Sequence, residues 1–547
     1  MPKAKKEATQ PPKNTAPSEE AIRLRKALTF YRQAKQEADR AVLTDEDWFR
    51  AKHWKYMKGN QPSLGHEPTT PFILNAVWHK HADAMDHYPE PIFLEREPND
   101  RPLAEALSKI VPLVLEKNDF ERVYSDVWWQ KIKHGTGIYY VGWDNSKENG
   151  LGDIVIRKVD LLRFYTEPHI DDIQQSRYVF VLSLSDTAEL KRRYPDKRIV
   201  SDADAITLES YSGCYDPVEL NGKSCLIDCY EKMRNSQGKE VVHLTKMVGE
   251  TILYSTKTDP DFAQTGLYEH GQYPFVVDPF IPNEASLYGI GLVEIARPTQ
   301  EYIDRLDYLI EANCLVSGRQ RFIVKRSSGI RPDDLRDMTR DLVECDSSAE
   351  DSVIRPLQAA AFPSHVMEHR QKKVDELKEV VGNRDFSQGG VNGGVTAYKS
   401  ISALQEAGDK LSRDVLKSSY RAFRQIVNLC VELIREFYDE ARSFRIIGED
   451  GNTAYVSLSN QKLKLQSNVG MDGSTLYRKA VFDVKIVSQR KNQFDSEQHN
   501  SLIREFYQSG AFSPENAESA MVALDAMMLE NKDKIIKALE KRKEKQA

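Results

Sequence analysis

The sequence lacks the short motifs by which many nucleotide-binding and hydrolytic enzymes are recognised. It has no G-x-x-x-x-G-K-[ST] phosphate loop, no H-E-x-x-H helix, no C-x-x-C pair and no G-x-S-x-G elbow. Acidic residues are plentiful, but their spacing marks out no pair as a two-metal site. We therefore predict no catalytic residue, no cofactor and no metal, and we favour a structural or interaction protein over an enzyme.

Cysteine is also scarce, with six in 547 residues, which suits a reducing compartment. Cys225 and Cys229 are four residues apart, but no second pair follows at the spacing of a zinc site. His79, His81 and His87 fall in a predicted helix over 72–87. Because His79 and His81 would lie on different faces of that helix, we expect packed or solvated histidines rather than ligands.

Long apolar runs and an excess of positive charge are absent too. No run of 18 apolar residues occurs, which argues against a membrane as partner. Lysine and arginine total 77 against 83 acidic residues, which gives a net charge of −6. A conventional nucleic-acid binder has an excess of positive charge, so this composition does not indicate one. Residues 1–18 are rich in polar residues and proline and lack the apolar segment of a signal peptide, so we predict a disordered tail.

Hydrophobic periodicity predicts an α+β fold that is mainly helical. Helices are expected over 19–60, 72–87 and 101–134, where Trp128 and Trp129 are core candidates. The block 135–280 is expected to hold a hairpin of 138–143 with 154–159, strands at 178–184, 224–231, 240–247 and 251–255, and a short helix capped by Ser185. Residues 201–219 are interpreted as a variable linker, and strands are expected at 443–447, 453–458 and 480–487 before a helical block over 493–543.

Two glycines mark a bend in the middle of the chain. Gly289 and Gly291 form a G-x-G without the third glycine of a dinucleotide site, so a tight bend before a helix is the better interpretation. Pro298 is tolerated in the first turn of that helix, which is predicted to reach about Ser317.

The stretch 365–442 organises the rest of the chain. The first predicted element is a helix from His365 to Val381, and Gly382 is expected to end it in a left-handed cap. A glycine-rich loop follows, and then a second helix, capped by Thr396, that reaches about Glu440. The second helix would span roughly 65 Å. Two interpretations remain open: a coiled-coil-like hairpin inside a helical protein, or a loop presented to something that moves past it.

Between two predicted helices, residues 319–358 form a compact insert whose charge is divided. Basic residues come first, and acidic residues follow: Arg319, Arg321, Lys325, Arg326, Arg331, Arg336 and Arg340, then Asp341, Glu344, Asp346, Glu350 and Asp351. The insert is either a solvated surface or a pairing surface, on which the basic half of one copy meets the acidic half of the next, as in a heterologous ring interface.

The order of these parts resembles that of a portal protein of tailed bacteriophages. The resemblance covers about residues 20–490 and lies in four stretches. The first stretch, residues 163–179, resembles a wing segment. The entry to the first stem helix is resembled by residues 273–275, 286–291 and 297–300. The insert takes the place of the clip, and residues 393–411 resemble the tunnel loop with its following helix.

The resemblance implies a division of the chain into a wing at 19–292, stem helix 1 at 293–318, a clip at 319–363 and stem helix 2 at 364–383. It continues with a tunnel loop at 384–397, a long wing helix at 398–442, wing strands at 443–490 and a small helical crown at 491–547. Such a subunit would assemble as a ring, expected to have 12 copies, at one capsid vertex of the virion after assembly in the host cytoplasm.

The function implied is passage of double-stranded DNA during packaging and ejection. Expected partners are the terminase large subunit, head-completion or tail adaptor proteins, and the major capsid and scaffolding proteins. The implied tunnel-loop residues are Arg384, Gln388, Gly389, Gly390, Val391, Asn392, Gly393, Gly394, Val395 and Lys399, with Lys372, Lys373 and Lys378 as channel-facing candidates of the stem. Alternatives are a capsid scaffold or connector that conducts no DNA, and a DNA-processing nuclease.

Overall fold

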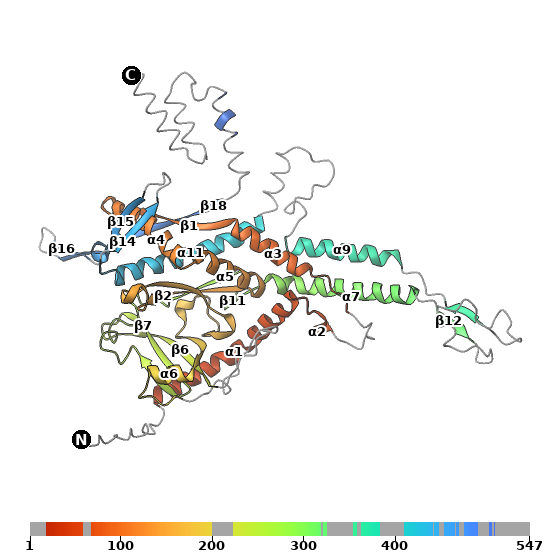
Figure 1. Cartoon of the computed structure of the whole chain (residues 1–547), viewed down its shortest axis with the longest axis horizontal. Helices are drawn as coiled ribbons and strands as arrows, with labels where there is room; N and C mark the ends of the chain where they lie inside the picture. The colour runs from red at the N-terminus through yellow and green to blue at the C-terminus, as the bar shows by residue number, and fades with distance from the viewer. Residues whose placement is uncertain are drawn as a thin grey trace, which may run out of the picture. The chain divides into compact units, whose positions relative to one another are not determined.

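The computed structural model describes residues 18–57, 67–199, 222–318, 321–324, 354–357, 363–382, 410–440, 442–447, 453–464, 466–469, 475–490, 501, 503–505 and 508. The chain divides into two compact units. Unit 1 comprises residues 1–46, 77–292 and 409–547, and unit 2 comprises residues 47–76 and 293–408. Figure 1 shows the elements along the chain.

A five-stranded antiparallel sheet forms the first part of unit 1. Its order is β4 (Phe164–Thr166), β5 (Tyr178–Asp186), β6 (Lys223–Arg234), β7 (Glu240–Val248) and β8 (Thr251–Ser255). Helix α1 (Glu19–Phe49) covers one face with Ala21, Leu24, Leu28 and Tyr31, which pack against Phe180 and Ile227. Because side chains alternate along a strand, neighbouring residues such as Val179 and Tyr230 face a second core.

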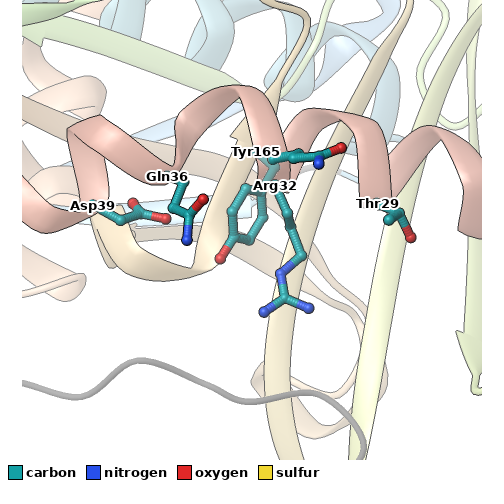
Figure 2. A pocket seen from close by; sticks show the side chains of 6 residues that line it. Thr29, Arg32, Gln36, Asp39 and Tyr165 are labelled. Carbon is teal, nitrogen blue, oxygen red and sulfur yellow. The ribbon is translucent and has the colours of Figure 1, made fainter.

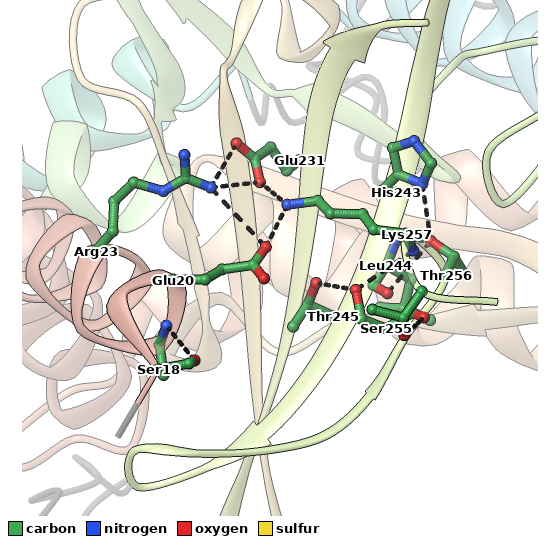
Figure 3. Close-up of polar contacts among 12 residues, drawn as sticks. Ser18, Glu20, Arg23, Glu231, His243, Leu244, Thr245, Ser255, Thr256 and Lys257 are labelled. Atoms are coloured by element: carbon green, nitrogen blue, oxygen red, sulfur yellow. Dashed lines mark hydrogen bonds and ion pairs between the residues drawn. The ribbon is translucent and has the colours of Figure 1, made fainter. Parts of the chain in front are cut away.

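Polar contacts reinforce the seam between α1 and this sheet. Glu231 of β6 is only 3% exposed and receives Arg23 of α1 at 3.2 Å and Lys257 at 2.5 Å. Lys257 also bonds Glu20 at 2.5 Å, so two cations and two carboxylates alternate across the seam, as Figure 3 shows. Because the buried Glu231 carboxylate is paired with two cations, the network holds the first turns of α1 on the sheet.

A three-stranded sheet of order β3-β2-β9 provides the second core. It consists of β2 (Thr136–Asp144), β3 (Asp153–Lys158) and β9 (Phe275–Pro279), and Ile138 and Phe275 belong to the second core. Helices α4 (Arg101–Lys117), α5 (Phe120–His134) and α11 (Lys410–Phe437) accompany it: α5 contacts β2 and β3, and α11 contacts β2 and β9. Short elements complete this region: α6 (Thr187–Arg193), β10 (Ile281–Asn283) and β11 (Ser286–Ile290).

Two-stranded ribbons complete unit 1. Strand β1 (His87–Glu95) pairs with β18 (Phe482–Arg490) over nine residues, from His87 opposite Arg490 to Glu95 opposite Phe482. The others join β14 (Arg442–Ile447) to β15 (Thr453–Leu458), and β16 (Gln466–Val469) to β17 (Thr475–Arg478). Thus segments almost 400 residues apart in sequence lie in one ribbon.

Unit 2 is built mainly from two helices. Most of α7 (Leu292–Gly318) and all of α9 (Ser364–Val380) belong to it, together with α2 (Trp54–Met57) and the short strands β12 (Arg321–Val324) and β13 (Ile354–Leu357). Helix α3 (Phe72–Met85) begins in unit 2 and ends in unit 1. Strands β12 and β13 pair antiparallel, with Arg321 opposite Leu357, which closes the base of the predicted insert.

Many expected elements are confirmed. The hairpin is β2–β3, the strands of the α+β block are β5 to β8, and strands occur near 443–447, 453–458 and 480–487. The helix predicted from His365 to Val381 is α9, and Gly382 follows it with φ +65° and donates its N–H to the Glu379 carbonyl at 3.1 Å. Of the helix predicted over 396–440, the described part is helical from Lys410 to Phe437.

Five expectations were wrong in detail. Pro298 lies inside α7, which begins at Leu292, and not in the first turn of that helix. The helix predicted over 101–134 is two helices, because Asp119 adopts a left-handed conformation (φ +50°) between them. The helix predicted over 19–60 ends at Phe49, close to Ala51 with φ +57°, and the one over 72–87 ends at Met85, so that His87 begins β1. Asp186, not Ser185, caps α6, since its carboxylate accepts the Ala188 N–H at 2.8 Å.

The glycine bend is confirmed, and its cause lies in a close approach of backbones. Gly135 has φ +82°, and a Cβ placed there would stand 2.1 Å from the Gly289 carbonyl oxygen. A Cβ on Gly291 would stand 2.5 Å from the Lys133 carbonyl. The end of α5 and the segment before α7 can therefore meet only because Gly135, Gly289 and Gly291 have no side chain.

Candidate functional site

The predicted tunnel loop lies outside the described residues. This applies to every candidate from Arg384 to Lys399, and to the linker at 201–219 and most of the helical block at 493–543. Among the charged residues of the insert, Arg321 falls in β12, where only its backbone is described; the others, from Arg319 to Asp351, fall outside. Their proposed roles stay predictions.

The three lysines predicted to face the channel differ in their surroundings on α9. Lys372 is exposed, whereas Lys378 is half-buried. Lys373 pairs with Glu376 at 2.7 Å, and its ammonium lies 5.5 Å from the ring centroid of Tyr302 on α7. Lys372 is thus the most available of the three for an external anion.

An ion pair joins helices α7 and α9. The Arg370 guanidinium donates to both carboxylate oxygens of Asp307, and this pairing raises the pKa of Arg370. Val374 and Leu377 of α9 are buried. Both helices also leave large apolar side chains exposed: Tyr302 and Leu309 on α7, and Met367 and Val380 on α9. Such exposed apolar residues on a rigid helix pair are suited to contact with another chain.

A buried histidine–carboxylate pair anchors α7 inside unit 2. His53 and Asp304 are both fully buried, with Nδ1 2.5 Å from Oδ2 of Asp304 and Nε2 2.9 Å from the Trp48 carbonyl. A carbonyl oxygen can only accept, so Nε2 carries a hydrogen, and the Nδ1–carboxylate contact requires one further proton on either group. Burial raises the pKa of Asp304, against the opposing effect of His53. Asp304 therefore holds a proton to higher pH than an exposed aspartate would.

A second buried cluster fixes α11 inside unit 1. The Lys131 ammonium of α5 donates to Asp278 of β9 at 2.7 Å and to the Ser419 hydroxyl of α11 at 2.6 Å. Ser419 in turn donates to the other oxygen of Asp278 at 2.6 Å. The three residues are at most 2% exposed. A serine, a lysine and an aspartate in contact suggest a hydrolase, but a nucleophile with no solvent access has no route to substrate, so this cluster is structural.

The exposed face of α11 is a feature that the sequence analysis missed. Arg413, Lys417, Arg421 and Arg424 are all exposed there. Their separations of four, four and three residues place them on one side of a helix. The spacing of these four cations can be seen in the sequence, but the net negative charge of the whole chain draws attention away from a local basic surface.

A groove of about 710 Å³ lies in unit 1 beside α11, lined among others by Phe93, Val484, His270 and Glu432. Near it, burial first, and then the neighbouring Glu269 and Glu432, raise the pKa of Glu436 to about 7. Burial lowers the pKa of His270 to about 4. A carboxyl group here can change charge near neutral pH, while the histidine stays neutral.

A smaller hollow of about 340 Å³ on α1 is shown in Figure 2. Its lining combines Tyr165 with polar side chains of α1, namely Thr29, Arg32, Gln33, Gln36 and Asp39. Asp39 is paired with Lys35 at 2.8 Å. The lining contains no histidine or cysteine, and its one carboxylate is already held by a lysine.

Metal-ligand clusters and membrane-spanning helices are both absent from the part of the chain that the structure describes. Within it, no three histidine, cysteine or acidic side chains come together as metal ligands would. No helix within it has the length and apolar character needed to cross a bilayer. Cys225 and Cys229 are both buried in β6, in the core beneath α1.

Comparison with known families identifies the class of protein. The model of the Phage P22-like portal protein family matches residues 80–272 and 327–547, which is well over half of the chain. No curated protein matches the sequence. The chain therefore belongs to the P22-like portal protein family. Members of this family are generally structural, and membership implies a ring-shaped homo-oligomer in the virion capsid, in contact with other phage proteins.

Proposed function

We propose that the protein forms the channel at one capsid vertex through which double-stranded DNA is packaged and later ejected. The observation that carries this proposal is the family match, which includes residues 327–547 and therefore most of the insert, the glycine loop and α11. In this proposal the ring has 12 subunits, and the terminase large subunit and then the head-completion or tail adaptor proteins dock on the clip.

The described structure supports the proposal through unit 2. Helices α7 and α9 flank the insert in sequence, and the Arg370–Asp307 ion pair joins them. The β12–β13 pair holds the two ends of the insert together. A pair of helices with a closed insert between its ends is what a stem with a clip requires. The exposed Tyr302, Leu309, Met367 and Val380 provide apolar surface for neighbouring copies.

We further propose that residues 384–397 form the constriction of the channel. Val391 and Val395 offer no phosphate ligand, and a net charge of −6 for each subunit disfavours adhesion of the duplex along the channel. A channel must let a polyanion pass, so weak attraction is an advantage. Deletion of residues 388–394 should impair packaging or DNA retention and leave the ring intact, whereas unchanged packaging and retention would remove the constriction role.

The first test is electron microscopy of the purified protein. Rings with a central opening wide enough for a duplex are expected, and a monomer or a closed disc would contradict the proposal. Reversal of Arg331 and Arg336 to glutamate should then weaken ring assembly or motor docking, because these residues belong to the basic half of the insert. Normal rings with normal packaging would instead indicate that the insert is a solvated surface.

A further inference from the structure

The exposed face of α11 carries a narrow row of positive charge. Arg413, Lys417, Arg421 and Arg424 are exposed and fall within an arc of about 80° on the helix, over roughly 16 Å of its length. We call these four residues the basic stripe. Since the chain as a whole has a net charge of −6, four cations on one helix face run against its composition.

Three of the four cations of the basic stripe are unpaired in the described structure, and the helix that carries them is firmly held. Lys417, Arg421 and Arg424 have no ion-pair partner among the residues that the structure describes, and Asp414 is an acidic neighbour at its edge. The opposite face of α11 is buried through Ala422, Phe423 and Ile426. Ser419, which lies between Lys417 and Arg421 in sequence, is bonded to Lys131 and Asp278. The cations therefore project from a helix whose rotation is fixed.

The composition of this face favours a phosphate backbone over a protein as its ligand. Its other exposed positions include Gln425 and Asn428, and no large apolar side chain of α11 is exposed among the described residues. Arginine is enriched in protein interfaces too, but the centres of those interfaces depend on aromatic or apolar anchors, and the exposed face of α11 has none among the described residues. Contacts to phosphates need only lysine, arginine and amide donors, which are the residue types present here.

We propose that the basic stripe of α11 binds the sugar–phosphate backbone of a DNA duplex without regard to sequence. This inference rests on the proposed function for the presence of DNA, and it adds a contact outside the loop and the stem lysines considered above. The ligand is a regular polyanion, with which guanidinium groups form paired hydrogen bonds.

The test is the salt dependence of duplex binding by the full-length, assembled protein. The probe is a fluorescent 30-base-pair duplex of mixed sequence, titrated between 50 and 200 mM KCl. The slope is that of the logarithm of the binding constant against the logarithm of the salt concentration, and each lost phosphate contact lowers its magnitude by about 0.9. The variant K417Q/R421Q/R424Q removes three cations, so it should lower the magnitude of the slope by about 2.7 for each stripe that contacts the duplex. The variant K417R/R421K/R424K should retain the slope, because it keeps the charge.

A matched control removes the same charge from another exposed surface. Lys191, Arg192 and Arg193 are consecutive exposed residues of α6, and K191Q/R192Q/R193Q should leave the slope unchanged. Equal slopes for the wild type and the stripe variant would overturn the inference while leaving the channel function intact. Loss of the ring in the stripe variant alone would show that the face contacts protein, and would also overturn it. Failure of the wild type to form rings would contradict the proposed function itself.

Discussion

Substitution of Lys131 by methionine tests whether the buried cluster on α11 is structural. The change removes the ammonium and leaves the Asp278 carboxylate, 1% exposed, with the Ser419 hydroxyl as its remaining hydrogen-bond partner in the cluster. Removing one partner of a buried ion pair costs about 3–5 kcal/mol, because the remaining charge is neither solvated nor neutralised. Methionine has a similar length and fills the space, so the loss reflects charge more than volume.

The double variant K131M/D278N separates that charge effect from packing. Asparagine is neutral and can still accept the Ser419 hydrogen bond, so the buried charge disappears together with its partner. We expect the double variant to recover about half or more of the loss, since buried ion pairs are often replaceable by neutral groups at little cost. Such non-additivity is the sign of direct contact between two residues.

The assay is urea unfolding followed by tryptophan fluorescence. Trp128 is a local reporter, because the Lys131 ammonium lies 4.6 Å from its ring centroid. The control K158M alters an exposed lysine of β3 and should change the free energy of unfolding by less than about 0.5 kcal/mol. A loss below about 1 kcal/mol for K131M, or a double variant no more stable than K131M, would refute the reasoning.

Two further predictions concern unit 1. G135A should destabilise the protein by about 2–3 kcal/mol in urea unfolding, because φ is +82° and the new Cβ would stand 2.1 Å from the Gly289 carbonyl oxygen. G238A, with φ +78° and open space around it, should cost only about 1 kcal/mol; equal losses would contradict the close approach. Glu436 has a pKa of about 7 in the folded protein and an ordinary pKa of 4.5 in the unfolded chain, so the folded protein binds this proton more tightly. The stability that the proton contributes is fully present below pH 4.5 and is lost as the pH rises through 7. Relative to E436Q, the wild type should lose about 1–2 kcal/mol between pH 5 and pH 8, allowing for partial exposure of the carboxyl group; parallel pH profiles for the two proteins would refute this.

Local patterns predicted much of the fold, since they depend on neighbours in sequence. The alternation over 138–143 predicted the hairpin because each strand has one side facing a core, and the seam of Val374 and Leu377 predicted α9 for the same reason. Gly382 was predicted as a cap because a left-handed residue at a helix end favours glycine. The errors fell at helix ends, where Asp119 and Asp186 act through their own side chains and backbone rather than through periodicity.

Long-range pairing could not be predicted in this way. Strand β1 contains Pro89 and Pro91 and reads poorly as a strand, yet it pairs along its whole length with β18, almost 400 residues later. Lys131, Asp278 and Ser419 are likewise far apart in sequence, and each is an ordinary surface residue type. Such contacts are selected by the tertiary fold, and a single sequence carries no local trace of them. Apart from the backbone of Arg321 in β12, the loop and insert candidates lie outside the described residues, so their roles remain predictions from the sequence.

The buried cluster and the basic stripe meet in one turn of α11, and this links stability to function. Ser419 faces inward to Lys131 and Asp278, while Lys417 and Arg421 on either side of it are exposed. A helix that loses its inward bonds can rotate or fray, and the cations then lose their common direction. K131M should therefore weaken the salt dependence of duplex binding even though Lys131 is fully buried and cannot touch DNA. If K131M lowered stability but left the binding slope at its wild-type value, the stripe would not depend on the buried cluster for its orientation.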